Sequence, residues 1–96
     1  MSTMGKRIRL LRNELKLSQE QFGAIFNSGK SYISAVENDK SKLSVDNLVK
    51  LLVDYDVNLN FVMGGIGEPF NTPKYESVKD EIMDKVRKML EDRGIQ

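Results

Sequence analysis

The first hydrophobic pattern along the chain is that of an amphipathic helix. Apolar residues recur every three or four positions, so they lie on one face of a helix. Ser2 or Thr3 can cap the first turn of this helix with a side-chain oxygen. The apolar face consists of Met4, Ile8, Leu11 and Leu15.

A capping box marks the start of a second helix. Ser18 is followed three residues later by Gln21, and the two side chains can bond reciprocally to backbone N–H groups. This helix is expected over residues 19–26. Residues 27–29 (NSG) end it, because Asn tolerates the left-handed conformation of a tight turn between helices.

Three more short helices are expected in the N-terminal part. One covers residues 30–38, with Ile33 and Val36 pointing inward, and the next begins after its cap Ser44. Asn58 caps a fifth helix, which a Gly-Gly pair ends. The apolar stripe expected for the fourth helix consists of Val45, Leu48, Leu51, Leu52 and Tyr55.

The remaining sequence changes in character. Residues 64–73 (GGIGEPFNTP) hold three glycines and both prolines, which indicates a linker or an irregular packed segment. A last, charged helix is expected over 74–93, with one apolar stripe of Val78, Ile82, Val86, Met89 and Leu90. The predicted fold is therefore all-α, with five helices in residues 1–66, a linker over 67–73 and an additional amphipathic C-terminal helix within 74–96.

The composition excludes several kinds of chemistry. The chain has 96 residues, no cysteine and no histidine. It therefore lacks disulfides, thiolate zinc ligands and an imidazole base, so an enzyme, a metal site or a cofactor is not expected. No apolar run approaches the roughly 20 residues of a membrane span, and no apolar signal-peptide core begins the chain. A cytoplasmic protein is expected.

Charge is distributed unevenly, although the net charge is only +1. Residues 1–43 hold eight Lys or Arg against four acidic residues. Residues 44–73 hold one Lys against four acids, and residues 74–96 hold six of each sign. The positive field is thus confined to the first half of the chain, which is where a nucleic acid would be attracted.

The stretch 17–38 (LSQEQFGAIFNSGKSYISAVEN) resembles the lambdoid-phage repressor and Cro family, also called the xenobiotic-response-element (XRE) family. The stretch 58–70 (NLNFVMGGIGEPF) is similar to the end of that family's five-helix domain. The resemblance implies a repressor-like domain that binds double-stranded DNA through a helix-turn-helix over residues 18–38. The residues that carry it are Ser18-Gln19, Gly23, Ile33-Ser34 and Glu37-Asn38.

The resemblance also implies which residues face the bases. The helix over 30–38 would enter the major groove with its N-terminal residues at base edges. Lys30 can donate to guanine O6 and N7, whereas Ala35 offers only a methyl contact. Tyr32 would touch either a base edge or the sugar-phosphate. The base-facing positions are Gly29, Lys30, Ser31, Ser34 and Ala35.

Other residues would hold the DNA backbone or the fold. Gln19 stands at the family's phosphate clamp, although glutamine is also common in the first turn of a helix. Lys40 could equally be a solvated surface charge. By the resemblance, Arg12 and Glu37 form a structural ion pair. The phosphate-facing candidates are Gln19, Asn38, Lys40 and Lys42, with Arg7 and Arg9 as further candidates.

Three residues near the turn depart from the family pattern. Asn27 replaces a glycine, Gly23 replaces a more usual alanine, and Ser28 replaces a small apolar residue. Glycine within a helix costs about 1 kcal/mol relative to alanine. The turn is therefore expected to be less stable than is usual in the family.

Three functions fit this sequence. The first is a homodimeric transcriptional repressor that binds an inverted-repeat operator. The second is an antitoxin that autoregulates its operon and neutralises a toxin through another surface. The third is an interaction adaptor without DNA binding, which the sparse side chains at Gly29 and Ala35 would suit. No small-molecule ligand is evident.

Three roles are open to the C-terminal helix. It can fold back onto the five-helix domain, pair with its mate in a homodimer, or dock on a partner protein. The homodimer is favoured, because helix-turn-helix operators have two-fold symmetry. Its contact would be made by Val78, Ile82, Val86 and Met89.

Overall fold

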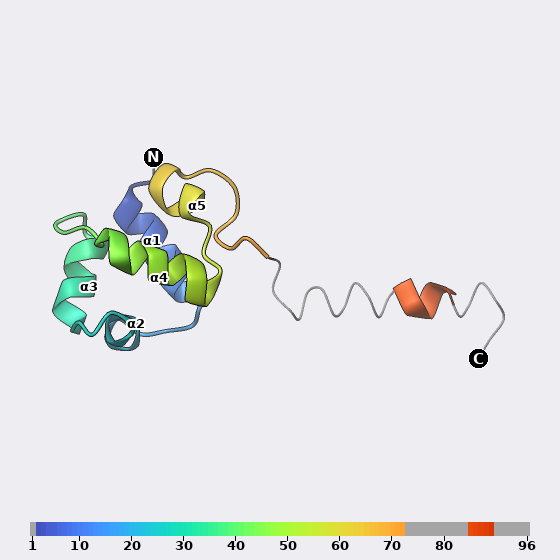
Figure 1. The fold of residues 1–96 in the computed structure, drawn as a ribbon, viewed down its shortest axis with the longest axis horizontal. Helices are drawn as coiled ribbons and strands as arrows, with labels where there is room; N and C mark the ends of the chain where they lie inside the picture. Colours follow the sequence, from blue (N-terminus) through green and yellow to red (C-terminus); the bar gives the residue numbers. More distant parts are fainter. Residues whose placement is uncertain (1, 73–84, 90–96) are drawn as a thin grey trace.

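The computed structural model describes residues 2–72 and 85–89, and Figure 1 shows their course. Five helices follow one another in the N-terminal part, and residues 85–89 are also helical. Apart from an isolated antiparallel bridge between Val57 and Phe70, the described residues contain no β-structure, so the predicted all-α fold is confirmed. The five helices are α1 (Met4–Glu14), α2 (Gln19–Ile25), α3 (Lys30–Glu37), α4 (Val45–Tyr55) and α5 (Leu59–Gly64).

Side-chain caps begin four of these helices. The capping box of α2 is complete, since the Gln21 N–H donates to Ser18 Oγ at 3.0 Å and the Ser18 N–H donates to Gln21 Oε1 at 2.9 Å. Such caps satisfy N–H groups that have no partner within the helix. The other three caps, which begin α1, α4 and α5, are Thr3, Ser44 and Asn58.

The hydrophobic core lies where α1 packs against α3 and α5, while α2 packs against α3. Phe22 meets Phe26 edge to face, with ring centroids 5.2 Å apart. Phe61 packs against the margin of this core. The largest fully buried side chains are Phe22, Ile8, Leu11, Ile33, Leu51, Val57 and Val62.

The apolar stripe predicted for α4 is only partly correct. Leu48 and Leu51 are buried in the core and Tyr55 packs against it, whereas Val45 and Leu52 are exposed. A helix turns about 100° per residue, which carries Val45 and Leu52 round to its outer side. The prediction was wrong for these two residues because α4 has apolar side chains on both its inner and its outer side.

Residues 67–72 are packed at the junction of α4 and α5. The Asn71 N–H donates to the carbonyl of Asp56 at 2.9 Å, and the Thr72 N–H donates to Asp56 Oδ2 at 2.8 Å. Asn71 and Thr72 are therefore tied to the C-terminal end of α4, whereas Pro73 lies outside the described residues. The chain leaves the domain beside the C-terminal end of α4.

Only part of the predicted C-terminal helix belongs to the described residues. Val78 and Ile82 lie outside them, whereas Val86 and Met89 belong to the helical stretch 85–89. No helix among the described residues is long and apolar enough to span a membrane.

Candidate nucleic-acid interface

The turn between α2 and α3 is tight because two backbones meet there. The Ser28 N–H donates to the carbonyl of Gly23 at 2.9 Å, and Asn27 adopts the left-handed conformation with a φ of 54°. A Cβ atom at Gly23 would lie 2.7 Å from the carbonyl oxygen of Ser28. Glycine therefore lets the turn approach α2, which gives the unusual residue at this position a structural reason.

Helix α3 has a buried row and an exposed start. Gly29, its N-cap, makes no side-chain cap, and a Cβ there would meet nothing within 4 Å. Lys30 and Ser31 are exposed beside it. The first turn of α3 is therefore open to a large partner. The buried row consists of Ile33, Val36 and Glu37.

The later residues expected to face DNA are held more closely by the protein. Ser34 and Ala35 are half-buried, and the Asn38 side-chain amide donates to the Ser34 carbonyl at 2.8 Å. The Tyr32 hydroxyl donates to the carbonyl of Lys42 at 2.9 Å, which ties α3 to the loop that follows it. In that loop Lys40 and Lys42 are exposed.

Arg12 and Glu37 form a bidentate ion pair between α1 and the end of α3. Arg12 Nε lies 2.7 Å from Glu37 Oε2, and Nη2 lies 3.1 Å from Oε1. Arg12 Nη1 also donates to the carbonyl of Leu17 at 2.8 Å. Because both side chains are largely buried, the pair links α1, the chain before α2, and α3 in one geometry.

Gln19 is oriented by the same ion pair. Its Nε2 donates to Glu37 Oε1 at 3.4 Å, and its side chain is half-buried. This contact lies between the N-terminus of α2 and the C-terminal end of α3. This hydrogen bond turns the Gln19 amide toward the ion pair.

A polar hollow opens beside Gln19. It lies where the second half of α1, the N-terminus of α2 and the first residue of α3 come together. Its lining contains three cationic side chains and one carboxylate, so it is suited to an anionic group. The lining residues are Arg9, Arg12, Ser18, Gln19, Glu20 and Lys30.

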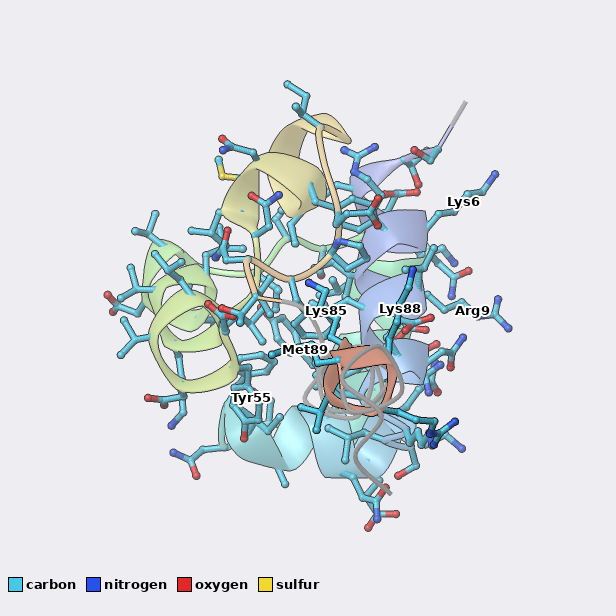
Figure 2. All side chains as sticks on the ribbon, turned by 90° about the vertical axis from the view of Figure 1, so that its right-hand side faces the viewer. Lys6, Arg9, Tyr55, Lys85, Lys88 and Met89 are labelled. Atoms are coloured by element: carbon cyan, nitrogen blue, oxygen red, sulfur yellow. The ribbon has the colours of Figure 1, made fainter. Side chains whose placement is uncertain are left out.

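The two further arginine candidates of α1 have different places. Arg9 lines the hollow, and Figure 2 shows it extending, like Lys6, away from the body of the domain. Arg7 instead donates through Nε to the carbonyl of Val62 at 2.9 Å and through Nη2 to that of Met63 at 3.3 Å. Arg7 therefore joins α1 to the end of α5, where carbonyls lack helical partners.

The spacing of Arg9 and Arg12 is the signal by which the hollow could have been anticipated. The two lie three residues apart on one side of a helix, so Arg9 neighbours the arginine of the ion pair. Ser18 and Glu20 also line the hollow, although neither was predicted as a site residue. Their places depend on the crossing of three helices, which local patterns do not report.

Asp39 fastens the loop after α3 to the start of α1. Its carboxylate accepts from the Thr3 hydroxyl at 2.6 Å and from the Gly5 N–H at 2.8 Å. The Thr3 hydrogen bond, the Gly5 backbone hydrogen bond, and the charges of Lys6 and Arg7 hold the pKa of Asp39 below its ordinary value. The loop that carries Lys40 and Lys42 is therefore anchored at its beginning.

No group of three or more His, Cys, Asp or Glu side chains able to hold a metal ion occurs among residues 2–72 and 85–89. Besides the Glu20 carboxylate, the site consists of backbone N–H groups, hydroxyls, the Gln19 side-chain amide and cationic side chains. These groups bind phosphates and base edges.

Comparison with known proteins agrees with this architecture. Residues 8–62 match the family model described as Helix-turn-helix. The chain is 28% identical over 101 residues to the uncharacterized HTH-type transcriptional regulator YobD of Bacillus subtilis (strain 168), covering 88% of this chain and 90% of that protein. The fold of this chain is similar to that in the crystal structure of a transcriptional regulator from Listeria innocua, with a TM-score of 0.59 and 15% sequence identity. The match covers 92% of this chain and 94% of that one.

Proposed function

Because the chain belongs to the helix-turn-helix family of the XRE (Cro/C1) type, whose members are DNA-binding transcriptional regulators, we propose that it represses transcription by binding an inverted-repeat operator as a homodimer. The observation that supports this most is the joint placement of Gln19 and Lys30 at one hollow, beside the open first turn of α3. Such a regulator works in the cytoplasm, where the DNA is.

The first turn of α3 would make the contacts with base edges. The major groove admits one helix, and the exposed N-terminal residues of α3 are those that can reach base edges. Lys30 would donate to guanine O6 and N7, and Ser31 would pair with either donors or acceptors. Ser34 and Ala35 would add shallower contacts, since both are half-buried.

Phosphate contacts would position this helix. Gln19, held by the Arg12–Glu37 pair, and Arg9 border the hollow on the α1–α2 side. Lys40 and Lys42 project from the anchored loop after α3. Together the Gln19 amide and the cationic side chains of Arg9, Lys40 and Lys42 would bind DNA phosphates beside α3.

Two copies would be needed for a specific complex. One helix-turn-helix of this size offers few base contacts. The DNA-binding domains of two copies, spaced by about 34–36 Å, would contact two half-sites on one face of DNA. The contact between copies would involve the C-terminal stripe of Val78, Ile82, Val86 and Met89.

Selection of bound duplexes from a random library by the full chain tests this function. We expect enrichment of one inverted repeat, and loss of preference at one base pair in each half-site for Lys30→Ala. Lys16→Met, an exposed lysine after α1 and outside the hollow, is the control and should enrich the wild-type repeat. If the wild-type chain enriches no sequence, or Lys30→Ala enriches the unaltered repeat, the proposal is wrong.

A further inference from the structure

The outer side of α4 carries an uncovered apolar strip. Val45 and Val53 are 75% and 72% exposed, and Val49 lies between them at 48%. These valines are four residues apart, so they line one side of the helix, and Leu52, 40% exposed, widens the strip. A row of exposed charges runs beside them: Asp46, Lys50 and Asp54. An isolated surface valine is ordinary, but a strip along a whole helix is typical of an interface.

The stretch 85–89 presents a second uncovered apolar surface. Val86 and Met89 are 44% and 53% exposed and, three residues apart, lie on one side of their helix. Lys85 and Lys88 are also exposed, and both border that side (Figure 2). This surface is apolar with a cationic edge, whereas the strip on α4 is apolar with a mainly acidic edge.

We propose that the outer strip of α4 receives the 85–89 helix of a second copy of this chain, and that the two copies exchange this contact reciprocally. Val86 and Met89 of one copy would cover Val49 and Val53 of the other. Lys85 and Lys88 would then face the row that contains Asp46 and Asp54. The inference rests on the proposed homodimer and names its docking surface.

A second copy is the occupant that the geometry favours. Among the described residues both surfaces are exposed, and the charges along their edges are mainly of opposite sign, as a contact between copies needs. A strip of four side chains is small for a stable dimer, which buries roughly 1,200–2,000 Å² in all. Two-fold exchange doubles the contact, because each copy supplies one strip and one 85–89 helix.

The chain path limits this exchange. Thr72 is fixed to Asp56, at the C-terminal end of α4. Residues 73–84 separate it from Lys85, and a chain of that length spans at most roughly 40 Å. As part of the helix predicted over 74–93, the same twelve residues would span about 18 Å. Reciprocal exchange therefore requires the α4 strip of the mate to lie within this reach of Thr72.

Cysteine cross-linking tests the proposal, because the chain has no cysteine of its own. Full-length Val53→Cys and Met89→Cys chains are mixed without DNA, oxidised, and separated under non-reducing conditions. We expect a disulfide-linked dimer that joins position 53 of one chain to position 89 of the other. Met63→Cys mixed with Met89→Cys is the matched control, since Met63 is as exposed but lies on α5, and it should give no linked dimer.

Other linkage patterns would overturn the proposal. A linked dimer from either variant alone would mean that like surfaces pair. A chain with both substitutions that loses its thiols while remaining a monomer would mean that 85–89 folds back on its own α4. A dimer by sedimentation without the 53–89 link would refute this docking surface alone, whereas a wild-type monomer would also refute the homodimer of the proposed function.

Charge reversal gives a second, independent readout. Asp46→Lys with Asp54→Lys should raise the dimer dissociation constant roughly tenfold, and adding Lys85→Glu with Lys88→Glu to the same chain should restore it. Glu68→Lys, at an exposed acid outside the α4 strip and its charged row, should leave it unchanged. If the chain with all four substitutions dimerises no more tightly than the chain with the two aspartate substitutions, the charged edges do not meet.

Discussion

Gly23 shows how one residue is fitted to a close backbone approach in the helix-turn-helix of this chain. Alanine is the better helix former by about 1 kcal/mol, and that preference alone predicts that Gly23→Ala stabilises the protein. A Cβ atom at this position would lie 2.7 Å from the Ser28 carbonyl oxygen, which predicts the opposite, because the backbone of the turn or of α2 would have to move. The close approach, rather than helix propensity, decides the residue at this position.

Thermal unfolding of Gly23→Ala therefore should show a lower melting temperature than that of the wild type. Gly64→Ala is the matched control: its Cβ would make ordinary contacts at 3.5 Å with Ile66, so stability should stay the same or rise. Equal melting temperatures for Gly23→Ala and the wild type would mean that the turn yields easily.

The Arg12–Glu37 pair is expected to act on both stability and DNA binding. Arg12→Met leaves the 4%-exposed Glu37 side chain without its cation, which costs about 3–5 kcal/mol when a buried pair is broken. Chemical denaturation measures this loss, with Lys16→Met, an exposed residue after α1, as a control within about 0.5 kcal/mol of the wild type. A loss below about 1 kcal/mol for Arg12→Met would contradict the structural role of the pair.

At the scale of the helix, Asp39 links the start of α1 to the loop after α3. Its pKa is lowered by the Thr3 hydroxyl first, and then by the Gly5 N–H and the charges of Lys6 and Arg7. A carboxylate with a lowered pKa in the folded protein contributes stability above its ordinary pKa, and that contribution disappears as pH falls through the lowered value. The Asp39 contacts should therefore loosen on the acid side.

Melting temperature measured against pH tests this contribution. Asp39→Asn should lower stability near neutral pH and flatten the decline below about pH 4, since the substituted side chain no longer titrates. Asparagine is suitable because it tolerates the positive φ of this position. Glu68→Gln, at an exposed position outside the α4 strip, is the control. An Asp39→Asn curve parallel to that of the wild type would show that Asp39 does not contribute.

The elements differ in how well the sequence predicts them. The beginning of α2 was predictable because the bonds between Ser18 and Gln21 span three residues, and Asn27 marked the turn by its conformational preference. The outer strip of α4 was not predictable, because Val45 and Leu52 satisfy a helical period as well as the buried residues do. Periodicity identifies a helix but does not decide which of two apolar sides faces the core.

Roles that depend on contacts between residues far apart in the sequence could not be predicted from the hydrophobic pattern either. Arg7 was a candidate for phosphate contact, but its guanidinium binds carbonyls of α5, far along the chain. Only the packing of α1 against α5 reveals this. The Arg12–Glu37 pair is equally distant in sequence, and it could be expected because the family resemblance carried it.

For the whole molecule, the C-terminal stripe is expected to control assembly. Ile82→Asp should yield a monomer that keeps its helix content and loses most of its operator affinity, because a charge would have to be buried at the contact between copies. Ile82→Leu, which keeps the apolar character, should remain a dimer. Analytical ultracentrifugation distinguishes the two. If the Ile82→Asp chain is still a dimer and its operator affinity is unchanged, the C-terminal stripe does not form the contact between copies, and docking of a partner protein is favoured.

The most direct test of DNA recognition by the α2–α3 face is the affinity for duplex DNA as a function of salt. If Lys40 and Lys42 neutralise DNA phosphates, the counterions condensed on those phosphates are released, so the logarithm of the association constant should fall linearly and steeply with the logarithm of salt concentration. Lys42→Ala should reduce that slope by about 1 for each bound head. An affinity that stays flat between low and moderate salt, or a slope unchanged by Lys42→Ala, would contradict the account.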